Sequence, residues 1–313
     1  MRGGPFGTIM VIIETDQRQK TPELGACRLR RAICCMNIRK LTAADIPFGL
    51  RLTAQNHWNQ LESDWRRQLD LEPEGCFLAE HSGLPIGTAC CCVFDDVAWI
   101  NLVLVDKAQR GQGVGSALLR HVVKYLEARG VASIRLDATP LGQPIYEKFG
   151  FLGDFTLTRF EGTLPAAFQE APGVEAMTRA DLAAVCRLDE AVTKTRREKL
   201  LRLLVQAYPE AARKFAPDGE LEGYSLARPG SHAWQLGPIQ GSPQAGRLLL
   251  LDVARCFAGQ QVHLDVPADH AHVVALAQAL GLTPQRPFLR MSRGRRGQEN
   301  LALFLSSFGP EKG

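Results

Sequence analysis

Apolar and polar positions along this chain follow the periods of both strands and helices. Short apolar runs that are bounded by polar or glycine-containing turns predict strands. The clearest runs of this kind lie at residues 76–80, 87–94, 97–105 and 133–138. Five aliphatic residues of segment 116–129 fall on one helical face, and Gly130 follows as a helix stop. With a short helix expected at 143–149, the order of elements predicts an α/β fold with a mixed (α+β) sheet.

The same local pattern occurs twice in the chain. Thr42 and Thr178 each follow a short strand-like run, precede an apolar-periodic helix and are suited to cap it. Trp99 in VAWINLVLV and Trp234 in HAWQLGPI repeat at nearly the same spacing as the two threonines. Two matches at one spacing predict a tandem duplication.

Domain boundaries follow from this repeat and from local composition. We expect domains at 36–160 and 174–313, joined by a linker at 161–173 that is rich in Ala, Pro and Gly. Segment 1–35 differs from both domains. Its apolar run 6–13 resembles a signal-peptide core, but polar residues follow without a small-residue cleavage site. The simpler interpretation of 1–35 is an unstructured extension, or a start codon assigned upstream of the true one.

Overall composition excludes several classes of protein. With 313 residues, 45% hydrophobic and 22% charged, the chain matches a globular protein of two domains. No stretch reaches the roughly 20 apolar residues of a membrane helix, so we expect no membrane partner. A net charge of +4 is too small to favour nucleic acid as a partner. The basic cluster near the C-terminus is interpreted as a solvated edge, made of Arg286, Arg290, Arg293, Arg295 and Arg296.

Nine cysteines are arranged as a poor disulfide framework. Cys34 and Cys35 are adjacent, and Cys90, Cys91 and Cys92 are consecutive. Consecutive strand residues point to alternate faces, so the run at 90–92 is expected to act as small buried hydrophobes. This usage favours a reducing, cytoplasmic compartment. Cysteine and histidine spacings do not match a zinc site, and we expect no metal.

The stretch that carries chemistry is Arg110-Gly-Gln-Gly-Val-Gly115, between an apolar strand and a helix. Glycines allow a tight turn that points successive N–H groups at one spot, and the helix N-terminus adds partial positive charge. Such a loop binds a pyrophosphate. It is neither a Rossmann fingerprint, because the spacing is GxGxG after several strands, nor an ATP P-loop, because no Gly-Lys-Ser/Thr follows.

This loop and a second motif resemble the Gcn5-related N-acetyltransferases (GNAT). RGQGVG fits that family's Arg/Gln-x-x-Gly-x-Gly/Ala motif, and YEKFGF at 146–151 is similar to its YEKLGF box. The resemblance covers about 36–160. WNQLESDW at 58–65 and the run LDATPLGQPIYEKFGF resemble a two-domain subfamily whose second half is divergent. The resemblance implies a tandem duplication of the GNAT fold with a degenerate second copy, a catalytic domain at 36–160, and acetyl-CoA as co-substrate.

The resemblance also implies roles for residues that bind the co-substrate. The backbone N–H groups expected to hold the CoA pyrophosphate are those of Gly111, Gln112, Gly113, Val114, Gly115 and Ser116. The pantetheine arm is expected to pair with main chain along Val103, Leu104 and Val105. Arg110 is expected to steady the loop or to meet a phosphate. Thr139 stands where many members carry an asparagine.

The remaining implied roles concern catalysis and the acceptor. Tyr146 is expected to be the general acid that protonates the leaving CoA thiolate. The residues expected to wall the acceptor site are Trp58, Asn59, Gln60 and Asp64. A primary amine with a pKa near 10 must lose a proton before it attacks the thioester, by a base or through water. The sequence leaves the base open among Asp64, Asp95, Asp96 and Asp137, with a water chain as the alternative.

The second half lacks both motifs. The loop before its corresponding helix has no RxxGxG, Pro243 removes one N–H donor, and the segment matching the tyrosine box is ALGLTPQR. We therefore expect it to complete the acceptor pocket or to be a structural partner, and Asp189, Tyr224 and Arg228 are the residues suggested to reach a ligand. The predicted function is N-acetyl transfer to a small-molecule or peptide amine by direct attack in a ternary complex, in a monomer or homodimer. The alternative is a non-catalytic acyl-CoA-binding sensor or scaffold.

Overall fold

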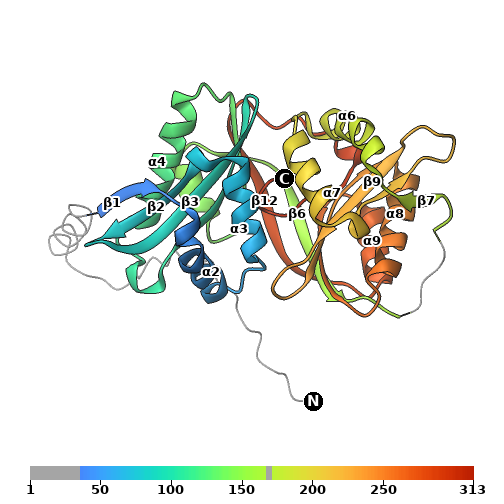
Figure 1. The fold of residues 1–313 in the computed structure, drawn as a ribbon, viewed down its shortest axis with the longest axis horizontal. Helices are drawn as coiled ribbons and strands as arrows, with labels where there is room; N and C mark the ends of the chain where they lie inside the picture. The colour runs from blue at the N-terminus through green and yellow to red at the C-terminus, as the bar shows by residue number, and fades with distance from the viewer. Residues whose placement is uncertain (1–35, 167–170) are drawn as a thin grey trace, which may run out of the picture.

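The computed structural model describes residues 36–166 and 171–313 of the chain, so the predicted extension at 1–35 lies outside the described residues. The described residues form one mixed sheet of 13 strands (Figure 1). The strand order is β1-β2-β3-β4-β5-β12-β6-β11-β10-β9-β8-β7, and β13 pairs with β10. Helices of the first half lie around one end of this sheet, and those of the second half around the other.

The first half contains the elements that the sequence predicts, with small shifts of their ends, and one long strand that it does not predict, β6. Its strands are β1 (Met36–Lys40), β2 (Cys76–His81), β3 (Leu84–Phe94), β4 (Val97–Val105), β5 (Ser133–Ala138) and β6 (Leu152–Thr163). Its helices are α2 (Ile46–Gln55), α3 (Glu62–Leu71), α4 (Val114–Ala128) and α5 (Gln143–Lys148). The apolar face of α4 is buried against the sheet through Leu118, Leu119, Val122 and Leu126, as its periodicity predicts.

The second half repeats this order. Its strands are β7 (Val174–Ala176), β8 (Arg213–Phe215), β9 (Gly223–Arg228), β10 (Trp234–Gly241), β11 (Gln261–Pro267), β12 (Thr283–Gly294) and β13 (Phe304–Ser306). Its helices are α6 (Leu182–Thr193), α7 (Glu198–Ala207), α8 (Pro243–Cys256) and α9 (Ala271–Ala279). Thr42 and Thr178, the two residues that revealed the repeat, both form capping boxes, with Asp45 and Asp181 respectively.

The two halves exchange their long final strands at the centre of the sheet. β6 of the first half pairs with β11 of the second, with Leu264 opposite Phe160. β12 of the second half pairs with β5 of the first, with Leu289 opposite Ala138. β6 and β12 also pair with each other, so the sheet is continuous through the crossing point (Figure 1). The predicted boundary at 160 therefore falls inside a strand that is hydrogen-bonded on both edges to the second half.

Candidate active site

Strands β4 and β5 start side by side and then diverge. Their parallel pairing is confined to the first residues of each strand, with Trp99 opposite Arg135 as the last pair. β4 continues to Val105 without a partner on that edge among the described residues. Its main-chain groups there are open to an added strand-like ligand.

A β-bulge re-aims β4 at the point where it leaves β5. The register with β3 shifts between the pairs Thr88–Leu104 and Cys90–Asn101. Leu102 adopts a positive φ of 49°, which is uncommon for a leucine, and its carbonyl accepts a 2.8 Å hydrogen bond from the Thr88 hydroxyl. This bond holds the strained backbone in place. Bulges often lie beside active sites because they redirect the chain toward a ligand.

The glycine-rich loop ends at the first turn of α4. Gly111 and Gly113 have φ values of 73° and 81°, so the loop needs residues without a Cβ at these two positions. Gly113 is the N-cap of α4, and it provides no side chain to accept hydrogen bonds from the first N–H groups of the helix. Those donors are available to an anion. Arg110 turns inward and donates to Val105 O and to Asn56 Oδ1, which fits the predicted role of steadying the loop.

The corresponding helix of the second half begins differently. Ser242 is the N-cap of α8, and its hydroxyl accepts a 3.2 Å hydrogen bond from the N–H of Ala245. Pro243 occupies the first helical position and has no N–H. The start of α8 therefore lacks one donor and satisfies another with its own N-cap, whereas the start of α4 has no side-chain cap.

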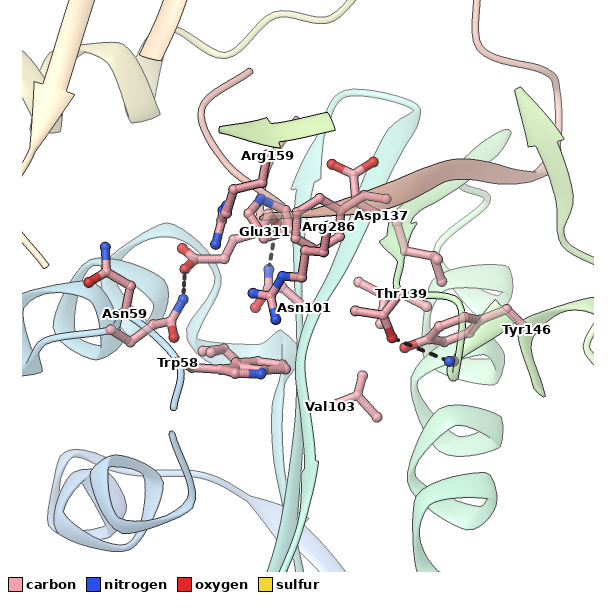
Figure 2. A pocket seen from close by; sticks show the side chains of 17 residues that line it. Trp58, Asn59, Asn101, Val103, Asp137, Thr139, Tyr146, Arg159, Arg286 and Glu311 are labelled. Carbon is pink, nitrogen blue, oxygen red and sulfur yellow. Dashed lines mark hydrogen bonds between the residues drawn. The ribbon is translucent and has the colours of Figure 1, made fainter. Parts of the chain in front are cut away.

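A cavity opens beside the divergence of β4 from β5 (Figure 2). The first half contributes Trp58, Asn59, Gln60, Ile100, Asn101, Leu102, Val103, Leu136, Asp137, Thr139, Gly142, Tyr146 and Arg159 to its lining. The second half contributes Arg286, Phe288, Pro310 and Glu311. The two halves thus build one cavity together, and its predicted use as the acceptor pocket stays a prediction.

Tyr146 and Thr139 lie on the side of the cavity next to Val103 (Figure 2). The hydroxyl of Thr139 accepts a 3.3 Å hydrogen bond from the N–H of Gly142, so it anchors the start of α5 and with it Tyr146. The tyrosine ring packs edge-on against Phe151, with ring centroids 6.0 Å apart. Burial raises the pKa of Tyr146 to about 12, which keeps its hydroxyl protonated at neutral pH.

The residues predicted to wall the acceptor site fall into two groups. Trp58, Asn59 and Gln60 line the cavity. The Asn59 side chain is fully engaged, because it donates to Ala233 O at 2.8 Å and accepts from the N–H groups of residues 232 and 233. Asp64 lies outside the cavity lining, where its carboxylate forms buried ion pairs with Arg67 at 2.7 Å and Arg228 at 3.1 Å.

The candidate bases are placed apart from one another. Asp137 lines the cavity, but both its oxygens accept hydrogen bonds from Arg290, at 2.8 and 2.9 Å. Asp95 and Asp96 lie at the exposed turn between β3 and β4 and do not reach the cavity. None of the four predicted carboxylates is therefore both in the cavity and free of an ion pair.

A carboxylate that sequence reasoning missed, Glu311, does line the cavity. It accepts hydrogen bonds from Gln60 Nε2 and, at 3.1 Å, from Arg228 Nη2. Arg228 and Lys312 hold the pKa of the Glu311 carboxyl well below its usual range, at about 2. Such a group is a weak base and acts as a fixed negative charge. Its sequence neighbourhood, a short segment after the last strand, carries no signal that would place it beside residues 60 and 101.

The basic cluster at 286–296 is not a solvated edge throughout, and that interpretation was wrong for two of its members. Arg290 is 1% exposed and stacks over Trp99 with 4.6 Å from its Cζ to the ring centroid. Arg286 lines the cavity. Strand alternation puts these two on the inner face because they are an even number of residues apart. Arg295 and Arg296 do lie at the surface, in ion pairs with Asp96 and Asp154.

Asp189, Tyr224 and Arg228, suggested from sequence to reach a ligand, do not line the cavity. Asp189 pairs with Arg197 at 2.6 Å and accepts a hydrogen bond from the Tyr224 hydroxyl, deep in the second half. Arg228 is the bridge between Asp64 and Glu311. Of the three, it is Arg228 that contacts a residue of the cavity lining, Glu311.

The cysteines behave as the sequence predicts where they are described. Cys90, Cys91 and Cys92 are free and fully buried, and burial raises the pKa of all three thiols.

Among residues 36–166 and 171–313, His, Cys, Asp and Glu do not gather into a group that could hold a metal ion. No helix in this part of the chain has the length and apolarity to cross a membrane. The cytoplasmic location stays a prediction.

Comparison with protein families matches both halves of the chain to one family. Residues 47–151 match the model described as "Acetyltransferase (GNAT) family". Residues 185–304 match a second model, described as "Acetyltransferase (GNAT) domain". The predicted tandem duplication of the GNAT fold is thereby confirmed.

Individual relatives agree with this assignment. The "Holothin acyltransferase" of Pseudoalteromonas sp. (strain SANK 73390) is 25% identical over 247 residues, which are 77% of this chain and 82% of that protein. The "Uncharacterized N-acetyltransferase YitH" of Bacillus subtilis (strain 168) is 28% identical over 187 residues, 57% of this chain and 63% of that protein. The crystal structure of a putative acetyltransferase from Pyrococcus horikoshii has the same fold, with a TM-score of 0.77 at 22% identity over 96% of this chain and 99% of that one.

Proposed function

Because the chain belongs to the GNAT acetyltransferase family and is an acyltransferase, we propose that it transfers an acetyl group from acetyl-CoA to a primary amine. The observation that carries the proposal is the uncapped start of α4 beside the open edge of β4, with Tyr146 in the lining of the same cavity as Val103. The acceptor is a small-molecule or peptide amine that enters from the side of Trp58. The second half serves this site and carries no second CoA site.

Each part of acetyl-CoA has a counterpart in this arrangement. The N–H groups of residues 111–116 donate hydrogen bonds to the pyrophosphate at the positive end of the α4 dipole. The open edge of β4 at Val103–Val105 offers main-chain hydrogen bonds to the pantetheine amides. The thioester then lies at the bulge, beside Tyr146. N–H groups of the bulged strand are the donors proposed for the oxygen of the tetrahedral intermediate.

Proton transfers complete the proposed reaction. The acceptor ammonium releases a proton to water in the cavity, because the carboxylates there are held in ion pairs. The neutral amine attacks the thioester carbon, the nitrogen of the resulting tetrahedral intermediate releases a second proton to water, and the C–S bond breaks as this intermediate collapses. Tyr146, with its raised pKa, donates its proton to the departing thiolate and regains one from water. No covalent bond to the enzyme is needed.

Acetyl-CoA titration tests the proposal. Calorimetry is expected to give saturable binding to the wild-type chain and none to Gly113→Glu, whose carboxylate would sit among the phosphate donors. Gly130→Glu is the matched control, because Gly130 also has a left-handed φ, of 71°, and nothing lies within 4 Å of its would-be Cβ. Unchanged binding by Gly113→Glu contradicts the proposal. Binding without CoA release across a broad amine panel would favour the non-catalytic sensor.

A further inference from the structure

We propose that the acceptor amine carries an anionic group, a carboxylate or a phosphate, which Arg286 binds. This inference rests on the proposed function and specifies the substrate class of the same cavity. Arg286 extends from β12 into the cavity that Tyr146 also lines (Figure 2). It is supplied by the second half, so the chain without that half would lack this contact.

The first argument is the charge balance of the cavity. Every other charged side chain that lines it has a partner of opposite sign within ion-pair distance. These pairs are Asp137–Arg290, Arg159–Asp265 and Glu311–Arg228. The side chain of Arg286 forms no ion pair and no hydrogen bond with any residue in the described part of the chain, and its Nε is buried without a partner. One positive charge is therefore left uncompensated beside the acceptor.

The second argument is that nearby carboxylates are already engaged. Asp265 accepts two hydrogen bonds of 2.7 Å from Arg159. Glu161 accepts one from Gln285 Nε2 and lies 3.5 Å from His263 Nε2. Neither is within 4.0 Å of Arg286. Burial, with the neighbouring Arg159, lowers the pKa of Arg286 to about 10, which still leaves the guanidinium charged at neutral pH.

The third argument comes from the duplication. Arg290 on β12 and Arg159 on β6 have equivalent places, since each pairs with an aspartate of the other half. Four residues before Arg159 stands Phe155, and four residues before Arg290 stands Arg286. Phe155 packs edge-on against Phe304 in the second half. At this repeated position β6 therefore carries an apolar ring, Phe155, whereas β12 carries a cation, Arg286, which lines the cavity.

The geometry also separates Arg286 from CoA. The cavity lining contains the bulge residues of β4 and Tyr146, but residues 111–116, in and just after the glycine-rich loop, are not part of it. Phe288 packs under the Arg286 guanidinium, with 5.0 Å from its Cζ to the ring centroid, and fixes the direction of the side chain. A guanidinium in this place meets the acceptor and not the pyrophosphate. Arginine recognises carboxylate and phosphate through the same paired N–H groups.

Matched acceptor pairs test the inference by CoA release. The carboxylate pairs are glycine with glycinamide and leucine with leucinamide, and the phosphate pair is O-phosphoethanolamine with ethanolamine. For each pair, the kcat/KM of the acceptor that carries the anionic group is divided by the kcat/KM of the acceptor that lacks it. This ratio is measured in wild type and in Arg286→Met. Comparing ratios cancels the different basicities of the amines. A guanidinium contact to an anion predicts that Arg286→Met lowers this ratio about tenfold or more, and that Arg286→Lys lowers it less.

Controls and a binding measurement make the result decisive. Arg202→Met makes the same change at an exposed site on α7 and is expected to leave the ratio unchanged. In a second assay, the CoA-loaded protein is titrated with N-acetylglycine and N-acetylglycinamide, and only the acid is expected to bind in an Arg286-dependent way. The proposal is overturned if the ratios in Arg286→Met equal those of the Arg202→Met control, or if acid and amide bind alike or not at all. If the wild-type chain does not bind acetyl-CoA, the proposed function itself is overturned.

Discussion

Arg290 of β12 donates two hydrogen bonds, of 2.8 and 2.9 Å, to Asp137 of β5, although the two residues belong to different halves of the chain. The reciprocal pair is present too: Arg159 of β6 donates two bonds of 2.7 Å to Asp265 of β11. All four side chains are at most 4% exposed. The exchange of final strands therefore places a bidentate ion pair at equivalent positions in both halves. We expect these contacts to make the halves unfold together.

Cooperative unfolding is the first prediction. In a Trp234→Phe background the remaining tryptophans, Trp58, Trp65 and Trp99, all report on the first half. Leu264→Ala in β11 removes a fully buried side chain of the second half, at a cost of about 2–5 kcal/mol. Because β6 pairs with β11, tryptophan fluorescence and far-UV circular dichroism are expected to shift to lower denaturant by the same amount. A tryptophan fluorescence transition whose denaturant midpoint is unchanged by Leu264→Ala would contradict the prediction.

Stability also depends on the Asp137–Arg290 pair. Asp137→Asn keeps the shape of the side chain but leaves the buried Arg290 charge with Glu299 alone, at 3.5 Å. Breaking such a pair costs about 3–5 kcal/mol, which denaturant titration measures. Asp96→Asn makes the same change in a surface pair with Arg295 and is expected to have little effect. Equal losses in the two variants would show that burial does not decide the strength of these pairs.

Tyr146→Phe tests the general acid. Without the hydroxyl, the thiolate leaves unprotonated, and kcat is expected to fall on the order of 10²-fold. The thiolate is a fair leaving group, so activity is not abolished. Acetyl-CoA affinity, measured by calorimetry, is expected to stay within about twofold because the ring remains. Tyr125→Phe, on α4 outside the cavity, is the control. A variant with wild-type kcat would remove Tyr146 from the mechanism.

The pH profile follows from the same groups. An acid is lost as pH rises through its pKa, so Tyr146, with a pKa of about 12, is expected to limit the rate only above about pH 11. The attacking amine must be neutral, so kcat/KM is expected to rise with pH up to the pKa of the acceptor itself. Two acceptors of different basicity are therefore expected to reach their plateaus at different pH values. A plateau at one common pH would instead reveal a titrating base on the enzyme.

Acid pH is expected to weaken the fold through His263. Burial and nearby Arg159 lower the pKa of this histidine from 6.5 to about 3. Between pH 6.5 and pH 3, His263 binds a proton in the unfolded chain but not in the folded chain. The free energy of unfolding is therefore unaffected by this group above pH 6.5 and decreases as the pH falls toward 3. His263→Asn is expected to flatten this part of the stability–pH curve. Denaturant midpoints at pH 7, 5.5 and 4 measure it, and parallel curves for wild type and variant would count against the assignment.

Local patterns in the sequence determined much of the first half. Strands at 97–105 and 133–138 have the predicted bounds, and α4 buries the face that its period indicates. The glycine-rich loop could be located because its positive φ values and its uncapped helix start depend on only a few adjacent residues. The duplication could be seen because it repeats local signals. Periodicity and turn chemistry act over a few residues, and sequence reasoning is strong at that range.

Only the tertiary structure decided which distant residues meet in the cavity. Arg286 and Glu311 reach it because β12 crosses into the first half's sheet and the chain after β13 folds back against Gln60 and Asn101. The same crossing turned Arg290 from an expected surface residue into a buried partner of Asp137. Which edge a strand joins depends on the summed pairing and burial of residues more than 100 positions apart, and no local pattern encodes that sum. The sequence alone thus located the proposed binding site for the acyl donor, whereas the fold decided what surrounds the acceptor.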